Sequence, residues 1–208
     1  MYCDPFMNKR NALKWIATGI GVAGAMALLG GCAEKKQNFS SIDITGADYA
    51  RDFTLTDHNG QARSIKDFEG KVVVMFFGFT QCPDVCPTSM LEMAAVKKQL
   101  GKNGDRLQGV FVTVDPERDT PEVLKAYMAN FDPTFLALYT SAEGLAALAK
   151  DYKMYYKKVP GPTPTSYSMD HSAGSYIYDT HGKLRLYARY GTDSPSMASD
   201  IALLLKNS

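Results

Sequence analysis

The chain has 208 residues, with 23 Lys and Arg residues against 22 Asp and Glu residues, for a formal net charge of +1 at pH 7. This length fits one ordinary domain plus a targeting segment, and 45% apolar with 22% charged residues is typical of a globular protein with a hydrophobic core. The near-neutral charge gives no support for the basic face that nucleic-acid-binding proteins need, so we expect no nucleic-acid partner.

The N-terminus resembles a secretory leader. Three basic side chains precede an uncharged stretch, residues 15–31, that is rich in Ala, Gly and Leu. This stretch is short for a membrane-spanning helix and has the proportions of a signal-peptide core. It ends in Leu-Gly-Gly followed by Cys32, which resembles the lipobox of bacterial lipoproteins, where the cysteine receives a diacylglycerol thioether and becomes the mature N-terminus.

This resemblance predicts a signal peptide over residues 1–31, a lipidated Cys32 that opens a flexible, polar tether over residues 32–47, and a domain over residues 48–208. The domain then lies in the cell envelope, on the periplasmic side of the cytoplasmic membrane, and is anchored to a membrane through its lipid. An uncleaved membrane anchor with an incidental cysteine is the alternative, and it places the domain on the same side.

The domain begins with a predicted hairpin and continues with a β-α-β unit. Turn residues at 57–60 separate the short strands 53–56 and 61–64. Two continuous apolar runs then suit strands buried on both faces, and a helical pattern lies between them. These three elements cover residues 72–79, 88–100 and 107–114.

The second half of the domain also alternates helices and strands. Thr120 as N-cap and Pro121 at the first helical position open a helix. The predicted elements are helix 120–130, strand 135–139, helix 141–151, a weaker strand 155–159, hairpin strands 174–178 and 184–190, and helix 194–205. A central β-α-β unit followed by an antiparallel hairpin and a helix is the order of a thioredoxin-like α/β fold.

A dithiol lies between the first buried strand and the helix that follows it. Because a residue before proline avoids helical backbone, Pro83 and Pro87 predict that Cys82 lies in a loop and that Cys86 is the N-cap of a helix starting at about Pro87. Free N–H groups at a helix N-terminus stabilise thiolate, the reactive and metal-binding form. The pair therefore indicates redox or metal chemistry, with a static disulfide or inert thiols as alternatives.

One of the three histidines is a candidate ligand. His58 and His181 lie in turn sequences and are predicted to be exposed. His171 follows a proline-broken loop and lies beside Asp170, which suits a metal ligand with a carboxylate that orients it. From the residues alone, an exposed loop histidine is the favoured interpretation of His171. Two thiolates with an imidazole would suit copper or zinc, which the spacing does not separate.

Three segments together resemble the Sco/SenC family of copper proteins linked to cytochrome c oxidase assembly, in its bacterial lipoprotein form. They are Phe76 to Pro87, which contains Cys-Pro-Asp-Val-Cys; Val114 to Pro121 with the following Leu124 to Tyr127; and Asp170 to Ser172. The similarity covers roughly residues 48–205, and the combination of the three segments is highly specific.

The resemblance implies a thioredoxin-like domain with an inserted hairpin and a central mixed β-sheet flanked by helices. It implies that Cys82 and Cys86 form a redox-active dithiol and bind Cu(I) and Cu(II) together with His171. It also implies delivery of copper to the CuA site of cytochrome c oxidase subunit II or to another copper enzyme.

Two other functions use the same dithiol. A thiol–disulfide reductase acting on partner-protein cysteines is compatible with copper binding. A peroxidase of the thioredoxin superfamily fits less well, since two close cysteines with a distant histidine suit a metal better. The segment from Val114 to Pro121 has no ligand cysteine or histidine, so we expect a structural role for it.

Overall fold

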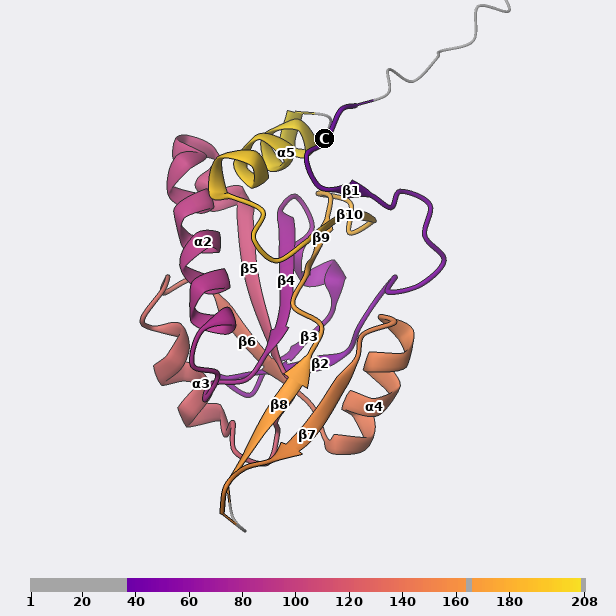
Figure 1. Ribbon diagram of the computed structural model, residues 1–208. Helices are drawn as coiled ribbons and strands as arrows, with labels where there is room; N and C mark the ends of the chain where they lie inside the picture. The colour runs from indigo at the N-terminus through magenta and orange to yellow at the C-terminus, as the bar shows by residue number, and fades with distance from the viewer. Residues whose placement is uncertain (1–36, 164–165, 207–208) are drawn as a thin grey trace, which may run out of the picture. The chain divides into compact units, whose positions relative to one another are not determined.

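The computed structural model describes residues 37–163 and 166–206, in which a compact unit begins at Asn38. Its centre is an eight-stranded mixed sheet in the order β1-β10-β9-β4-β5-β6-β2-β3 (Figure 1). The strands of this sheet are β1 (Ile42–Asp43), β2 (Leu55–Asp57), β3 (Ala62–Arg63), β4 (Val72–Gly78), β5 (Leu107–Thr113), β6 (Leu136–Tyr139), β9 (Ser175–Tyr178) and β10 (Leu184–Ala188).

Helices cover both faces of the sheet. They are α2 (Val85–Gln99), α3 (Pro121–Met128), α4 (Ala142–Asp151) and α5 (Ser194–Lys206), with short 3-10 helices η2 (Ile65–Phe68) and η3 (Gly101–Arg106). Successive side chains of a strand point to opposite faces. On β4, Gly78 faces Cys86 of α2, whereas the ring of Phe77 lies 5.1 Å from that of Tyr152 at the end of α4. The α2 and α4 helices therefore lie on opposite sides of the sheet (Figure 1).

The predicted β-α-β unit is confirmed as β4, α2 and β5. The two strands are parallel, they are paired from Val72↔Leu107 to Gly78↔Thr113, and every residue in them is buried. Their apolar, β-branched and aromatic side chains suit this fully buried position. Because parallel strands end at the same edge of a sheet, the loops that follow β4 and β5 lie beside each other. This edge carries the candidate site.

A separate two-stranded sheet, β7 (Tyr156–Pro160) and β8 (Tyr167–His171), lies between α4 and β9 in the chain. It corresponds to the inserted hairpin that the family resemblance implied. The sequence predicted a loop where β8 lies, because the prolines between the two strands obscure the pattern. The residues of β8 nevertheless alternate between the buried and the exposed side, as the strand period of two requires. The central sheet, the helices and this hairpin together form the expected thioredoxin-like fold.

The N-terminal segment of the domain is more ordered than a tether. The backbone N–H groups of Ser40 and Ser41 each donate a hydrogen bond to the carboxylate of Asp200 on α5, both at 2.8 Å. The β1 strand then pairs with β10. The compact unit that the structure describes therefore includes residues 38–47, which precede the predicted domain.

The predicted signal peptide and Cys32 lie outside the described residues. In the part of the chain that the structure describes, no helix is both long enough and apolar enough to cross a membrane.

Candidate metal centre

The two cysteines lie at the junction between β4 and α2. Cys82 is in the loop, as predicted, but Cys86 is the second residue of the helix and not its N-cap. The helix begins two residues before Pro87 because the N–H of Thr88 donates to the carbonyl of Asp84, at 3.1 Å. Proline fits in a first helical turn, where backbone N–H groups have no helical acceptor. This overrides the extended preference before proline.

A hydrogen bond in the first turn of α2 connects the two cysteines. The backbone N–H of Cys86 donates a hydrogen bond to Sγ of Cys82 at 3.4 Å. Both cysteines are free thiols, and Cys86 is fully buried whereas Cys82 is half-buried. Gly78, the last residue of β4, leaves room for the buried sulfur, since a Cβ atom there would lie 2.9 Å from Cys86 Sγ.

His171 brings an imidazole to this dithiol from the end of β8. Its Nε2 lies 3.4 Å from Cys86 Sγ, and its Nδ1 lies 3.0 Å from the carbonyl oxygen of Ser172. Because the carbonyl can only accept, Nδ1 carries the proton and the lone pair of Nε2 faces the sulfur. The rings of Phe76 and Phe79 meet the imidazole edge-on, with centroids 6.0 and 5.9 Å away. His171 is thus fixed and half-buried, and the exposed-loop interpretation is wrong.

Burial controls the protonation of the site. Desolvation raises the pKa of the Cys86 thiol and lowers the pKa of His171, because it disfavours the charged form of each. The thiol S–H therefore donates to a neutral imidazole. We expected the helix N-terminus to favour thiolate, but at Cys86 the desolvation is the larger effect. A metal ion that binds here must displace the thiol proton.

The three side chains fit a single metal ion. The two Sγ atoms and the imidazole nitrogen all lie within 4.8 Å of one another. Four-coordinate sites with metal–sulfur distances of about 2.3 Å and metal–nitrogen distances of about 2.0 Å place their ligand atoms roughly 3.5–3.8 Å apart. Closure around an ion therefore needs side-chain shifts on the order of 1 Å. A hollow of about 290 Å³, lined by Cys82, His171 and Met169 among others, connects the site to the surface.

Asp170 does not orient the imidazole in the way that we predicted. In β8 the side chain of Asp170 is exposed, whereas its neighbour His171 faces the domain, because successive strand residues point to opposite sides. The orienting contact at Nδ1 comes from the Ser172 carbonyl instead. Asp170 acts on His171 only through its charge, which is the smallest influence on the pKa of that imidazole.

The other two histidines are remote from the dithiol. His181 is exposed, as predicted. His58 is half-buried, and its Nδ1 accepts a hydrogen bond from the backbone N–H of Ala137 at 3.1 Å. It therefore joins two strands of the sheet and is not the exposed turn residue that we expected.

The loop between β5 and α3 contributes contacts that the sequence did not predict. The carboxylate of Asp119 accepts hydrogen bonds from the hydroxyl and the backbone N–H of Thr80, at 2.6 and 3.1 Å, just before Cys82. Arg118 reaches β8 through Tyr167. The only signal in the sequence is a distinctive Asp-Pro-Glu-Arg-Asp-Thr-Pro segment without cysteine or histidine, for which we expected a structural role.

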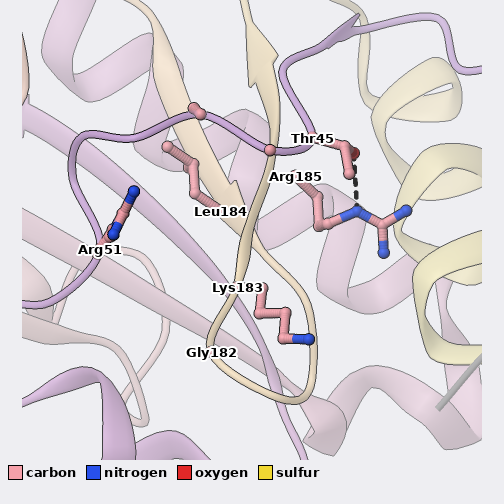
Figure 2. Close-up of a pocket in the computed structure, with 8 residues that line it drawn as sticks. Thr45, Arg51, Gly182, Lys183, Leu184 and Arg185 are labelled. Atoms are coloured by element: carbon pink, nitrogen blue, oxygen red, sulfur yellow. Dashed lines mark hydrogen bonds between the residues drawn. The ribbon is translucent and has the colours of Figure 1, made fainter.

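A second hollow of about 280 Å³ lies at β10 and the segment after β1. Arg51, Lys183 and Arg185 line it, but Arg185 donates to the hydroxyl of Thr45 at 2.9 Å and does not point toward Arg51 (Figure 2). Its basic side chains do not converge on one point, and it adds nothing to the metal centre.

Comparisons with known proteins agree with this geometry. The SCO1/SenC family model matches residues 43–206. A SCO2-like protein of Rickettsia felis is 38% identical over 133 residues, which cover 64% of this chain and 65% of that protein. The chain spans about half to two thirds of the length of the curated relatives that it matches.

Solved structures are similar as well. Copper-bound ScoI of Bradyrhizobium japonicum is 38% identical, with a TM-score of 0.67, and the match covers 74% of this chain and 97% of that one. A SCO1/SenC family lipoprotein from Bacillus anthracis str. Ames is 26% identical, with a TM-score of 0.63, over 82% of this chain and 98% of that one.

Proposed function

Because this chain belongs to the SCO1/SenC family, we propose that it is a copper metallochaperone that binds copper through Cys82, Cys86 and His171. One observation carries the proposal: two thiols and an imidazole from distant parts of the chain present their ligand atoms within 4.8 Å of one another. The copper bound to the similar ScoI protein supports it.

The chemistry of the donors fits both oxidation states of copper. Two soft thiolates suit Cu(I), and an imidazole improves the site for Cu(II). Cys86 loses its thiol proton on binding, and His171 needs no deprotonation because it is neutral already. The recipient that we propose from family membership is the CuA site of cytochrome c oxidase subunit II, or another copper enzyme.

The test is copper binding by the reduced protein. We expect the wild type to bind Cu(I) and Cu(II), Cys82→Ser and Cys86→Ser to lose both, and His171→Ala to lose Cu(II) above all. His181→Ala is the matched control, because this histidine is exposed and remote from the dithiol. If His171→Ala binds both copper states as tightly as the wild type, the three-ligand site is wrong.

A thiol–disulfide reductase is the second candidate, because the free sulfur of Cys82 lines the hollow that opens to the surface. Cys82 thiolate would attack a partner disulfide, form a mixed disulfide and release one partner thiol. Cys86 would then displace the second partner thiol and close the Cys82–Cys86 disulfide, so that two electrons pass to the partner. With Cys86→Ser, we expect the mixed disulfide through Cys82 to accumulate. If no mixed disulfide forms with an oxidised partner, the reductase function is excluded.

We also propose that Cys32 carries a lipid that holds the domain on the periplasmic side of a membrane. The lipobox-like sequence before Cys32 and the similarity to a Bacillus anthracis family lipoprotein support this. Cys32→Ser should move the protein from the membrane fraction to the soluble fraction. Substitution of Cys3, the other cysteine of the predicted signal peptide region, is the control, and Cys3→Ser should leave the protein in place. Membrane retention of Cys32→Ser would point to the uncleaved anchor instead.

A further inference from the structure

Two adjacent residues of one loop, Arg118 and Asp119, contact the segments that carry the metal ligands. Asp119 is buried and binds Thr80, two residues before Cys82. Its neighbour Arg118 binds Tyr167, four residues before His171 in β8. This loop, between β5 and α3, therefore contacts the dithiol loop on one side and the inserted hairpin on the other.

Arg118 makes several contacts with Tyr167 and its surroundings, and its Nη1 also donates a hydrogen bond to the side-chain oxygen of Gln81, next to Cys82, at 3.0 Å. Its Nη1 donates to the carbonyl oxygen of Tyr167 at 2.9 Å, and its guanidinium carbon lies 3.5 Å from the centroid of the Tyr167 ring. Its Nε donates to the carboxylate of Asp115, which also accepts a hydrogen bond from the Tyr167 hydroxyl at 2.8 Å. These contacts close a triangle of Arg118, Asp115 and Tyr167 that only a planar, multidentate guanidinium can complete.

Arg118 is one of the hairpin's attachments to the domain, beside the buried side chain of Met169 and the ion pair of Lys158 with Glu117. The β7 and β8 strands form their own sheet, so no ladder hydrogen bond joins them to the central sheet. The backbone N–H of Ser172 bonds to the carbonyl of Tyr155, and that of Gly161 to the carbonyl of Ser166. By the alternation of an antiparallel ladder, the carbonyl of Tyr167 points away from β7. Arg118 binds the outer edge of β8 at this carbonyl.

The attachment point and the ligand share one face of the same strand. Tyr167 and His171 are an even number of positions apart, and both are half-buried, whereas Ser168 and Asp170 between them are exposed. At about 3.3 Å per residue, the two Cα atoms lie roughly 13 Å apart. A strand transmits a displacement over this short length, so the position of Tyr167 affects where the imidazole of His171 lies.

We propose that Arg118 is a positioning residue that holds β8 in the place where His171 completes the copper site. The inference rests on the proposed copper function and deepens it. Cu(I) is satisfied by the two thiolates, whereas Cu(II) depends on the imidazole. Loss of Arg118 should therefore separate the two oxidation states of copper, which a merely structural defect would not do.

The decisive experiment compares Arg118→Met with Arg185→Met. Both arginines pair with an aspartate, but Arg185 pairs with Asp179 beside the second hollow, away from the metal centre. For Arg118→Met we expect Cu(II) affinity to fall about 10-fold or more and the thiolate-to-Cu(II) absorption bands to shift, because partners that orient a ligand typically change metal affinity by about 10- to 100-fold. Cu(I) affinity should stay at the wild-type value, and Arg185→Met should change neither.

Two more variants distinguish the positive charge of Arg118 from the hydrogen bonds that it makes. Arg118→Lys keeps the charge but cannot bind Asp115 and the Tyr167 carbonyl together, so it should also lose Cu(II). Tyr167→Phe removes only the hydroxyl bond to Asp115 and should show a smaller loss of Cu(II) affinity in the same direction. Full recovery of Cu(II) binding in Arg118→Lys, or equal losses of Cu(I) and Cu(II) in Arg118→Met, would overturn the proposal.

A measurement on the copper-free protein tests the role of Arg118 separately from copper binding. Amide hydrogen exchange of β8 should be faster in Arg118→Met than in the wild type and in Arg185→Met. Wild-type protein that fails to bind copper refutes the metallochaperone. Unchanged exchange in β8, together with unchanged Cu(II) binding in Arg118→Met, refutes the positioning role and leaves the metallochaperone intact.

Discussion

At the scale of single residues, Cys86 shows two opposed effects on one thiol. Its place in the first turn of α2 favours the thiolate, and its complete burial favours the thiol. Burial is the larger effect, and the neutral imidazole of His171, 3.4 Å away, accepts the thiol proton in a hydrogen bond. The buried half of the site is therefore uncharged until a metal ion exchanges for that proton.

The raised pKa of Cys86 predicts a loss of stability at alkaline pH. The unfolded thiol ionises near its ordinary value of 9.0, whereas the folded thiol keeps its proton to higher pH. Above pH 9.0 the unfolded chain binds fewer protons than the folded one, so the free energy of unfolding falls as pH rises, by at most about 1.4 kcal/mol per pH unit for one group. Urea unfolding of the reduced protein measures this slope.

Cys86→Ala is the comparison for this prediction, and its slope should be shallower than that of the wild type. Buried tyrosines, such as Tyr152 and Tyr178, also have raised pKa values and add the same sign of slope at higher pH. These tyrosines are present in both proteins, so their contribution cancels when the slope of Cys86→Ala is subtracted from that of the wild type. Equal slopes for the two proteins would show that Cys86 ionises equally easily in the folded and the unfolded chain.

Some of the site could be predicted from the sequence. Cys82 and Cys86 are neighbours along the chain, and their spacing alone indicated a dithiol. His171 lies 85 positions beyond Cys86, so only the family resemblance joined it to the pair. The protonation state could not be predicted, because it depends on burial that the packed fold alone creates. The role predicted for Asp170 is wrong because the sequence does not reveal β8, the strand that exposes this side chain.

At the scale of elements, the carboxyl end of β4 determines the space available to the dithiol. The strand delivers Gly78 against Cys86 Sγ and the rings of Phe76 and Phe111, each of which would lie within 2.9 Å of an added Cβ atom. The site therefore depends on glycine at position 78 as well as on the three side chains that bind the metal.

Gly78→Ala should damage both stability and copper binding. The added methyl group must displace buried aromatic rings and the sulfur, which typically costs about 1–3 kcal/mol of unfolding free energy. Gly109→Ala in β5 is the matched control, because its Cβ would lie 2.7 Å from the Phe135 ring and 2.8 Å from Met93 Sδ. It should lose comparable stability in urea unfolding but bind copper normally. Normal copper binding by Gly78→Ala would contradict this view.

Helices and strands could be predicted from the sequence where the residues within them carry a clear signal. The β4 and β5 strands were predicted almost to the residue, because apolar runs of this length that are rich in β-branched and aromatic residues favour buried strands. The α3 helix was predicted from Thr120 and Pro121, and Thr120 does accept the hydrogen bond of its N-cap. The start of α2 was misplaced because a backbone preference before Pro87 is weaker than the hydrogen bonding of a complete helical turn.

At the scale of the whole domain, the chain enters beside α5, away from the β7–β8 hairpin (Figure 1). Asp200 fixes this entry through Ser40 and Ser41 and is itself buried. If Cys32 is lipidated, the eight residues up to Ser40 can span at most about 28 Å. A lipid-bound link of this length would hold the domain close to the membrane surface.

Asp200→Asn should release the N-terminal segment without affecting the metal centre. An amide offers one acceptor oxygen where the carboxylate offers two, and hydrogen bonds to charged groups contribute about 1.5–3 kcal/mol. Amide exchange of residues 40–43 should become faster, while copper affinity stays unchanged. Asp193→Asn is the control, because its carboxylate binds only Ser196 near the start of the same helix. Unchanged exchange at Ser40 and Ser41 would show that β1 pairing alone holds the segment.

The unequal depth of the two sulfurs has a kinetic consequence. Cys82 lines the hollow that opens to the surface, whereas Cys86 is fully buried behind it and contacts His171. A thiol from another protein could approach a bound ion through this hollow, which Cys82 and His171 both line. The bonds to these two ligands would therefore be exchanged before the bond to Cys86. The ion would stay bound to the buried Cys86 sulfur while the incoming sulfur takes its place, so it need not enter free solution during the exchange.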